Sequence, residues 1–207
     1  LIQSIPVAPL KLASLEGCRT LADQVNNYLV SFRHESPTNV GQADSLQGYC
    51  ADSYLLECEC PRFGSGEGKG VLKESVRGCD LFIMVDVTNY SLTYRVNGYE
   101  NHMSPDNHYQ DLKRIISAAD GKARRINVIM PFLYEGRQHK RSKRESLDCA
   151  LMLQELVDMG VSNILTFDAH DPRVSNSIPL HGFDSFMPTY QFLKALVNSV
   201  PDFVIDN

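Results

Sequence analysis

Residues 125–168 read RINVIMPFLYEGRQHKRSKRESLDCALMLQELVDMGVSNILTFD, and they decide the fold class. Short apolar runs at 125–131 and from 162 to about 170 predict two buried strands of a parallel sheet. Between them, residues 144–160 carry apolar side chains at helical spacing and end at Gly160, a residue type common just after a helix. Strand, helix and strand in this order predict a parallel unit with a right-handed crossover.

The same alternation of strands and helices extends to both sides of this unit. DLFIMVDV at 80–87 is another short apolar run, and SPDNHYQDLKRIISAA at 104–119 opens with a serine cap and a proline, which favours a helix. Between them, SLTYRVNGYE at 91–100 places Asn-Gly between β-forming residues, a strong hairpin signal. The other expected elements are strands at 9–14 and 53–60 and helices at 19–33 and 189–200.

The composition of the 207 residues excludes several classes of protein. An apolar fraction of 43% supports a buried core and argues against disorder. The 20 Lys and Arg against 25 Asp and Glu give a net charge of −5, which argues against a dedicated nucleic-acid binder. No apolar run approaches the roughly 20 residues that a membrane span needs, and the start of the chain does not resemble a signal peptide. We therefore expect a cytoplasmic protein that binds neither membranes nor nucleic acid.

The six cysteines predict neither a disulfide framework nor a metal site. A chain of this length needs no cross-links to fold, and the cysteine spacings are irregular. Cys58 and Cys60 would share one face of an extended segment, but a zinc site would need two further ligands at a recognisable spacing. We therefore expect buried, reduced thiols. The histidines outside the segments described next (His34, His102, His108 and His181) are expected on the surface or in the core.

The first segment that could carry chemistry is RQHKRSKR at 137–144, which follows one strand and precedes a helix. In parallel sheets, ligands bind outside the carboxyl ends of the strands. A basic loop before a helix N-terminus suits a polyphosphate, because guanidinium groups and the helix dipole both attract negative charge. A solvated basic loop is the alternative. Arg137 and Gln138 are the better candidates because they lie nearest to the strand end.

The second segment is Asp168-Ala169-His170-Asp171, at the end of the next strand. Asp168 and His170 would point the same way if the strand continued. An aspartate and a histidine can together hold a divalent cation or act as an acid–base pair, or they can simply hydrogen-bond a loop. With Asp171 they also admit a metal-dependent phosphohydrolase, although a two-metal site would need further carboxylates.

The third segment, FGSGEGKGVLKESVRG at 63–78, has glycine at alternate positions from 64 to 70. It matches neither the phosphate-binding loop nor the dinucleotide fingerprint. A flexible loop or a close-packed hairpin would explain the glycines. In a functional interpretation, Phe63 stacks on a base and Glu67 accepts a hydrogen bond from the exocyclic amine of that base.

Taken together and in order, these segments resemble the ribose-phosphate pyrophosphokinase (phosphoribosyl-pyrophosphate synthetase) family from about residue 10 to 190. CPRFGSGEGKGVLKESVRGCDLFI is similar to a family stretch with F-S-[ND]-x-E and then V-R-G-x-D. INVIMPFLYEGRQHKR is similar to a strand followed by R-Q-[DH], and ILTFDAH is similar to T-x-D-x-H. The R-Q and D-x-H elements at this separation, with V-R-G upstream, form a specific signature.

The resemblance implies a phosphoribosyltransferase-like, three-layer αβα domain with a mostly parallel sheet. It also implies a Mg²⁺-dependent enzyme that transfers the diphosphoryl group of ATP to the C1 hydroxyl of ribose 5-phosphate, giving phosphoribosyl pyrophosphate and AMP. The implied ATP-binding residues are Phe63, Glu67, Arg137, Gln138 and Asp168, and the implied catalytic and metal-binding residue is His170. In the family the loop with Phe63 and Glu67 reaches into a neighbouring subunit, which implies a homo-oligomer.

Three departures from the family pattern are visible. Ser65 replaces the usual Asn or Asp of the adenine loop, which leaves the nucleotide preference open. His139 stands where Asp is commoner. The stretch 88–103 is longer than the usual connection, which predicts a β-hairpin insertion whose role the sequence does not reveal.

The resemblance covers only the first part of the family's domain organisation. We expect residues 1–200 to form the N-terminal domain and residues 201–207 to begin a C-terminal domain, which in the family carries the ribose-phosphate loop. The chain is then the ATP-side half of the enzyme and is expected to be inactive alone. A non-catalytic associated or regulatory subunit is the alternative, although the intact R-Q and D-x-H pairs argue against it.

Overall fold

A computed structural model describes residues 7–35 and 48–200 of the chain. At its centre lies a six-stranded sheet in the order β10-β9-β8-β5-β1-β2, in which every neighbouring pair is parallel. These strands are β1 (Leu10–Ser14), β2 (Leu55–Leu56), β5 (Asp80–Met84), β8 (Arg125–Ile129), β9 (Val161–Phe167) and β10 (Gly182–Phe186). The predicted α/β class with a mostly parallel sheet is confirmed.

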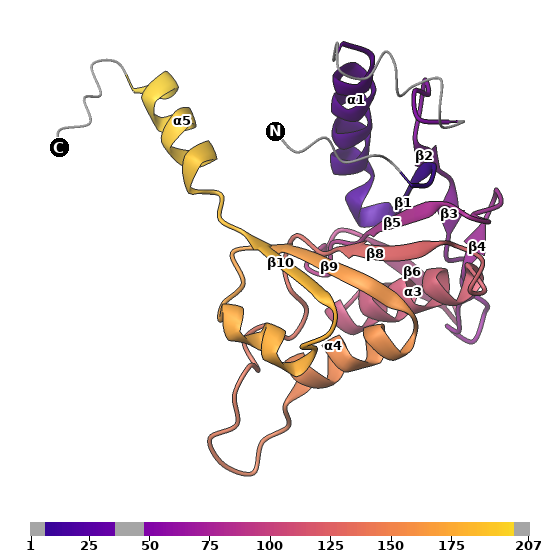
Figure 1. Ribbon diagram of the computed structural model, residues 1–207. Coiled ribbons are helices and arrows are strands. Elements are labelled where there is room, and N and C mark those ends of the chain that lie inside the picture. Colours follow the sequence, from indigo (N-terminus) through magenta and orange to yellow (C-terminus); the bar gives the residue numbers. More distant parts are fainter. Residues whose placement is uncertain (1–6, 36–47, 201–207) are drawn as a thin grey trace, which may run out of the picture.

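Helices lie on both faces of this sheet, which gives three layers (Figure 1). α1 (Arg19–Glu35) lies on one face, and α3 (Pro105–Ala118) and α4 (Asp148–Asp158) lie on the other. The main core joins the sheet to α3 and α4, and its fully buried side chains include Leu81, Ile83, Leu112, Ile115, Leu153 and Leu156. A smaller cluster joins α1 to the opposite face: Leu12, Cys18, Ala22 and Met84. Cover on both faces explains why the central strands are apolar runs.

α5 (Thr189–Ser199) differs from these helices because none of its residues is buried. It follows β10 and extends away from the sheet (Figure 1). Its large apolar side chains are exposed: Tyr190, Phe192, Leu193, Leu196 and Val197. Phe167 and Phe186, at the ends of β9 and β10, are also 47% and 49% exposed. The spacing of apolar residues thus predicts this helix correctly. It does not reveal that the apolar side chains of the helix are exposed.

The strand expected at 53–60 is divided between two sheets. β2 joins the central sheet beside β1, whereas β3 (Cys58–Glu59) pairs antiparallel with β4 (Val71–Leu72). Leu56 and Cys58, two residues apart, are nevertheless both buried, as the alternation of side chains along an extended segment requires. The sequence pattern does not predict β10. This edge strand is only half buried and lacks the apolar run of a central strand.

Two elements beside the candidate segments are shorter than expected. The helix expected from residue 144 begins at Asp148, because the Glu145 carboxylate accepts hydrogen bonds from the N–H and hydroxyl of Ser142 in a separate turn. The strand expected to continue to 170 ends at Phe167, because Asp168 adopts the left-handed region with φ of 45°. Residues 201–207, and with them the expected start of a second domain, lie outside the described residues.

The insertion expected near 88–103 is a hairpin formed by β6 (Thr93–Val96) and β7 (Tyr99–His102). Asn97 and Gly98 have φ of 49° and 85°, as a type I′ turn requires. α3 also begins as predicted, since the Ser104 hydroxyl accepts a hydrogen bond from the Asn107 N–H. Local turn and capping signals therefore predict this region well.

All six cysteines lie within the described residues and are free. Burial raises the pKa of Cys18 to about 12 and that of Cys58 to about 11, so both remain thiols. His102 and His108 have structural contacts, since a ring nitrogen of each lies 2.9 and 2.6 Å from a backbone carbonyl oxygen. No helix in the two described ranges is long and apolar enough to cross a membrane.

Candidate functional site

The loops after β8, β9 and β10 meet at the carboxyl edge of the sheet. The Phe167 N–H donates to the carbonyl of Pro131, and the Asp168 N–H donates to the carbonyl of Phe186. Glu135 and Asp168, which follow β8 and β9, both have positive φ, at 55° and 45°. Left-handed conformations of residues other than glycine store strain and are concentrated at functional sites. This edge is also where ligands bind in parallel sheets.

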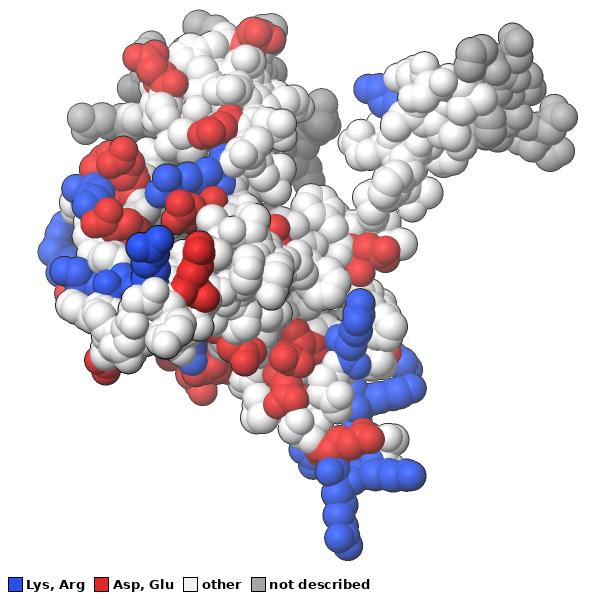
Figure 2. All heavy atoms as spheres, turned by 180° about the vertical axis from the view of Figure 1, so that it is seen from behind, with Lys and Arg blue, Asp and Glu red and all other residues white. Residues whose placement is uncertain are grey.

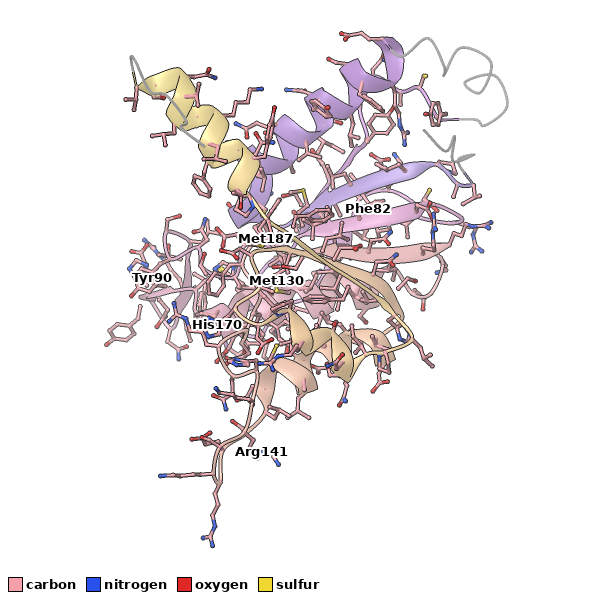
Figure 3. All side chains as sticks on the ribbon, turned by 60° about the vertical axis from the view of Figure 1, so that its left-hand side comes forward. Phe82, Tyr90, Met130, Arg141, His170 and Met187 are labelled. Atoms are coloured by element: carbon pink, nitrogen blue, oxygen red, sulfur yellow. The ribbon has the colours of Figure 1, made fainter. Side chains whose placement is uncertain are left out.

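His139 connects the first two predicted segments. Its Nε2 lies 3.5 Å from Oδ2 of Asp171, and both side chains are only 12% exposed. Its ring also meets the ring of His170 edge-on, with 5.1 Å between the centroids. Figure 3 shows His170 between the sheet and the projecting loop that carries Arg141. The structure thus brings the basic segment and the D-x-H segment together, as the sequence predicts.

Asp171 holds the D-x-H loop in place. Its carboxylate accepts hydrogen bonds from the backbone N–H and the guanidinium of Arg173, and it caps the short helix η3 (Pro172–Ser177). These hydrogen bonds, with a smaller contribution from His139, hold the pKa of Asp171 well below its usual range. Asp171 is therefore an ionised structural group. Because Arg173 donates to both carboxylate oxygens, the phosphohydrolase interpretation, which uses Asp171 as a metal ligand, loses support.

Asp168 and His170 do not share a strand face, because the strand ends before them. Both side chains are exposed at the carboxyl edge. No group of three His, Cys, Asp or Glu side chains within residues 7–35 and 48–200 could hold a metal ion. Any metal site built on this pair would therefore need further ligands from outside these side chains.

Arg137 and Gln138 have different surroundings. Arg137 is exposed and lines a hollow of about 320 Å³ whose other walls are Val87, Thr88, Pro105, Phe132, Tyr134, Glu135 and Gly136.

 The guanidinium of Arg137 has no hydrogen-bond or ion-pair partner in the part of the chain that the structure describes. Gln138 instead closes the base of the basic loop, because its side-chain amide donates to the carbonyl of Ser146 at 2.7 Å. Arg137 is thus available to a ligand, and Gln138 positions the loop.

The remaining basic residues of 137–144 project away from the body. Lys140, Arg141, Lys143 and Arg144 are all exposed, and they form the blue projection at the lower right of Figure 2. The segment precedes a helix as expected, and the Cys149 N–H at the start of α4 donates to the Gln138 carbonyl, but residues 145–147 separate the four basic side chains from that helix. α4 begins only at Asp148, and this first-turn carboxylate, which accepts from the Ser146 hydroxyl, already interacts favourably with the helix dipole.

A cluster of carboxylates and one tyrosine, which the sequence patterns do not reveal, lies beside Arg137. The Tyr134 hydroxyl donates to Asp106 in the first turn of α3 at 2.5 Å. Burial raises the pKa of Glu135, and the nearby carboxylates of Asp148 and Asp106 raise it further. These residues come from three separate segments, so no local sequence pattern could have identified them.

The glycine segment is a close-packed hairpin. The Phe63 N–H donates to the Glu67 carbonyl at 2.7 Å, which makes a tight turn. A Cβ atom on Gly68 would lie 2.3 Å from Nη1 of Arg62, and one on Gly70 would lie 2.4 Å from the backbone oxygen of Arg114. Glycine is therefore required where the segment crosses α3. Phe63 remains 53% exposed at the tip of the turn.

The glycine hairpin and the carboxyl edge are separate within one chain. No hydrogen bond or ion pair among the described residues joins Phe63 or Glu67 to Arg137, Gln138 or His170. The hairpin packs on Arg114 near the end of α3, whereas Tyr134 binds Asp106 in its first turn. Eight residues separate these two positions, which is about 12 Å along a helix. The structure therefore unites two of the three predicted segments.

Comparison with known proteins decides the family. A family model described as the N-terminal domain of ribose phosphate pyrophosphokinase matches residues 10–160, well over half of the chain. The chain belongs to the ribose-phosphate pyrophosphokinase family. The resemblance inferred from the three segments is thereby confirmed. The matched range includes Phe63, Glu67, Arg137 and Gln138 and ends before the D-x-H segment.

Individual members of the ribose-phosphate pyrophosphokinase family agree with this match. The chain is 29% identical over 167 residues to the ribose-phosphate pyrophosphokinases of Corynebacterium ammoniagenes and Bacillus cereus, covering 80% of this chain and 41% of each relative. It therefore spans less than half the length of these relatives. The crystal structure of phosphoribosylpyrophosphate synthetase from Mycobacterium smegmatis has the same fold, with a TM-score of 0.67, 20% identity, and coverage of 92% of this chain and 52% of that one.

Proposed function

We propose that the chain provides the ATP-binding half of a ribose-phosphate diphosphokinase. In this reaction the β,γ-diphosphoryl group of ATP passes to the C1 hydroxyl of ribose 5-phosphate, and the products are phosphoribosyl pyrophosphate and AMP. The observation that carries the proposal is the contact of His139 with Asp171 and His170, which joins the basic segment to the D-x-H segment at the carboxyl edge. Membership of the family supports the same reaction.

The transfer requires the attacking hydroxyl, the β-phosphorus and the leaving oxygen to lie in line, so catalysis rests on positioning and charge stabilisation. Arg137 has an exposed guanidinium without a partner in the described residues, which suits a phosphate group. His170 presents its ring at the same edge and is assigned to the reacting phosphates. Gln138 contributes by closing the base of the basic loop.

Asp168 and His170 fit Mg²⁺ as a partial site. Mg²⁺ is usually bound by one or two carboxylates together with substrate phosphates and water. Asp168 supplies an exposed carboxylate two residues before His170, and the phosphates of ATP would complete the ligand set. When bound, Mg²⁺ neutralises charge on the phosphate oxygens.

We assign adenine recognition to Phe63 and Glu67 of a neighbouring subunit, so the proposed enzyme is a homo-oligomer. The exposure of Phe63 and the separation of the glycine hairpin from Arg137 within one chain support this assignment. The proposed partners are ATP, ribose 5-phosphate and further copies of the chain, in the cytoplasm.

A mixing experiment tests this proposal. Phe63→Ala and His170→Ala should each lower the affinity for Mg-ATP, and both side chains are exposed, so both variants should fold. An equimolar mixture should recover part of the binding, because some sites then combine an intact hairpin with an intact His170. A mixture that binds no better than the two variants apart would contradict a site shared between subunits.

A product assay tests the assignment to one half of the enzyme. With Mg-ATP and ribose 5-phosphate, the 207-residue chain should form no phosphoribosyl pyrophosphate, since its sequence holds no counterpart of the family's ribose-phosphate loop. Product formation by the pure chain would mean that the ribose-phosphate site lies within these residues.

A non-catalytic associated or regulatory subunit of the same family is the second candidate. The Ser65 hydroxyl donates to one oxygen of the Glu67 carboxylate at 2.8 Å, so Glu67 has less acceptor capacity left for an adenine amine. This candidate predicts that neither Mg-ATP nor Mg-ADP binds to the chain at any concentration that saturates a working synthetase.

A further inference from the structure

The β6–β7 hairpin lies against the glycine hairpin. The Arg62 guanidinium carbon lies 5.4 Å from the ring centroid of Tyr94, a favourable cation–π distance. A Cβ atom on Gly66 would meet Cγ2 of Val96 at 3.0 Å and the Tyr94 ring at 4.0 Å. Tyr94 and Val96 occupy alternate positions of β6, and both are half-buried, so one face of the strand is turned toward the glycine hairpin.

The base of the glycine hairpin is firmly held. Arg62 donates two hydrogen bonds, of 2.6 and 2.8 Å, to the carboxylate of Asp111 on α3. Arg114 donates to the same carboxylate, and the Asp111 side chain is only 7% exposed. This buried network fixes Arg62 before the turn, and Arg62 in turn pairs with Gly68 after it through an antiparallel bridge, but the network does not reach the tip.

The tip of the glycine hairpin has few contacts of its own. A Cβ atom on Gly64 would meet no atom within 4 Å, and Phe63, Ser65 and Glu67 are exposed. Of the two glycines at the tip, Gly66 is the one placed against the insertion, since a Cβ atom there would meet Val96 and Tyr94. The position of the tip therefore depends on the insertion.

The insertion is itself anchored to the body. Nε2 of His108, which is buried on α3, lies 2.6 Å from the carbonyl oxygen of Asn89. The His102 ring stacks on Tyr90 with 4.3 Å between the centroids. The first contact joins the start of the insertion to α3, and the second holds its two ends together, so the hairpin can act as a support.

We propose that the β6–β7 hairpin braces the tip of the glycine hairpin, and that Tyr94 and Val96 are positioning residues for base recognition by Phe63 and Glu67. This inference rests on the proposed function, because it takes the glycine hairpin as the adenine-binding element. A tip that is ordered before binding loses less conformational freedom when the base arrives, so the brace increases affinity without touching the nucleotide.

A tryptophan reporter tests the brace directly. The chain contains no tryptophan, so Phe63→Trp provides a single fluorophore at the tip. Tyr94→Ala with Val96→Ala should lower the anisotropy of Trp fluorescence at position 63 and increase its quenching by acrylamide. Tyr99→Ala is the matched control, because Tyr99 belongs to the same hairpin and is 77% exposed. Unchanged anisotropy and quenching in the double variant would overturn the proposal.

Ligand titrations then separate the brace from the proposed function. In the background with Phe63 intact, the double variant should lose at least about fivefold in affinity for Mg-ATP, as expected when base–aromatic stacking is impaired. Its affinity for Mg-tripolyphosphate, which has no base, should not change. An equal loss for both ligands would contradict a role in base recognition. If the wild type binds neither ligand while the fluorescence depends on Tyr94 and Val96, the proposed function fails and the brace remains.

Discussion

The glycine hairpin and the basic loop are both polar segments, but the structure holds them in different ways. The glycine hairpin is fixed by Asp111, which binds two arginines, and by glycines that cross α3 without a gap. The basic loop is closed at its base by Gln138 and His139, and its other basic side chains extend into solvent. A segment rich in glycine can thus be the more closely packed one, because the neighbouring side chains rather than the composition determine how a segment is held.

The largest effect on stability is expected from Asp111→Ala, which removes the carboxylate that holds the base of the glycine hairpin. The substitution leaves Arg62 and Arg114 without their buried partner and should lower the free energy of unfolding by about 3–5 kcal/mol. Urea denaturation measures this. Lys73→Ala, which removes an exposed pair with Glu59, is the control and should cost less than about 1 kcal/mol. Equal losses of stability in the two variants would show that the buried Asp111 network contributes no more than an exposed ion pair.

A smaller effect is expected from Gly70→Ala. The new methyl group would lie 2.4 Å from the backbone oxygen of Arg114, so the hairpin must shift, at a cost of about 1–3 kcal/mol. Gly64→Ala is the matched control in the same segment, because open space surrounds the position, and it should be neutral or slightly stabilising. Thermal unfolding of both variants measures the difference in stability. A Gly70→Ala protein as stable as Gly64→Ala would argue against close packing on α3.

The contact between α3 and α4 should make the stability of the protein depend on pH. Partial burial would raise the pKa of Glu155, but the hydrogen bonds from Lys113 and Tyr109 outweigh it, and the pKa lies below its usual value. A lowered folded-state pKa stabilises the protein above the unfolded-state value of about 4.3, and this stabilisation declines as the pH falls through the folded-state pKa. Glu155→Gln should therefore reduce the loss of stability between pH 5 and 3, measured in urea. Parallel curves for both proteins would contradict this.

The smallest effect on stability is expected in the basic loop. Arg141→Ala removes an exposed side chain at its tip and should change the free energy of unfolding by less than about 0.5 kcal/mol. A larger decrease in stability, measured by thermal unfolding, would mean that the projecting loop contributes to the folded core.

The sequence predicted what depends on local patterns. The strands at 125–131 and 162–167, the Asn-Gly hairpin and the Ser104 cap all follow from the periodicity and chemistry of neighbouring residues. The contact between the R-Q and D-x-H segments also follows, because parallel strands end at one edge of the sheet. The burial of Asp111 between two arginines could not be predicted, since its partners are separated in sequence and their packing is set by tertiary structure.

The most direct test of the carboxyl-edge site is a calorimetric titration with Mg-ATP. Wild-type chain and Arg137→Ala would be compared at the same salt concentration, with Lys122→Ala as a control for the loss of a positive charge elsewhere. We predict that Arg137→Ala weakens binding by at least about tenfold, since a hydrogen bond to a charged group contributes about 1.5–3 kcal/mol. Equal affinity of Arg137→Ala and wild type would contradict the assignment of this edge to the phosphates of ATP.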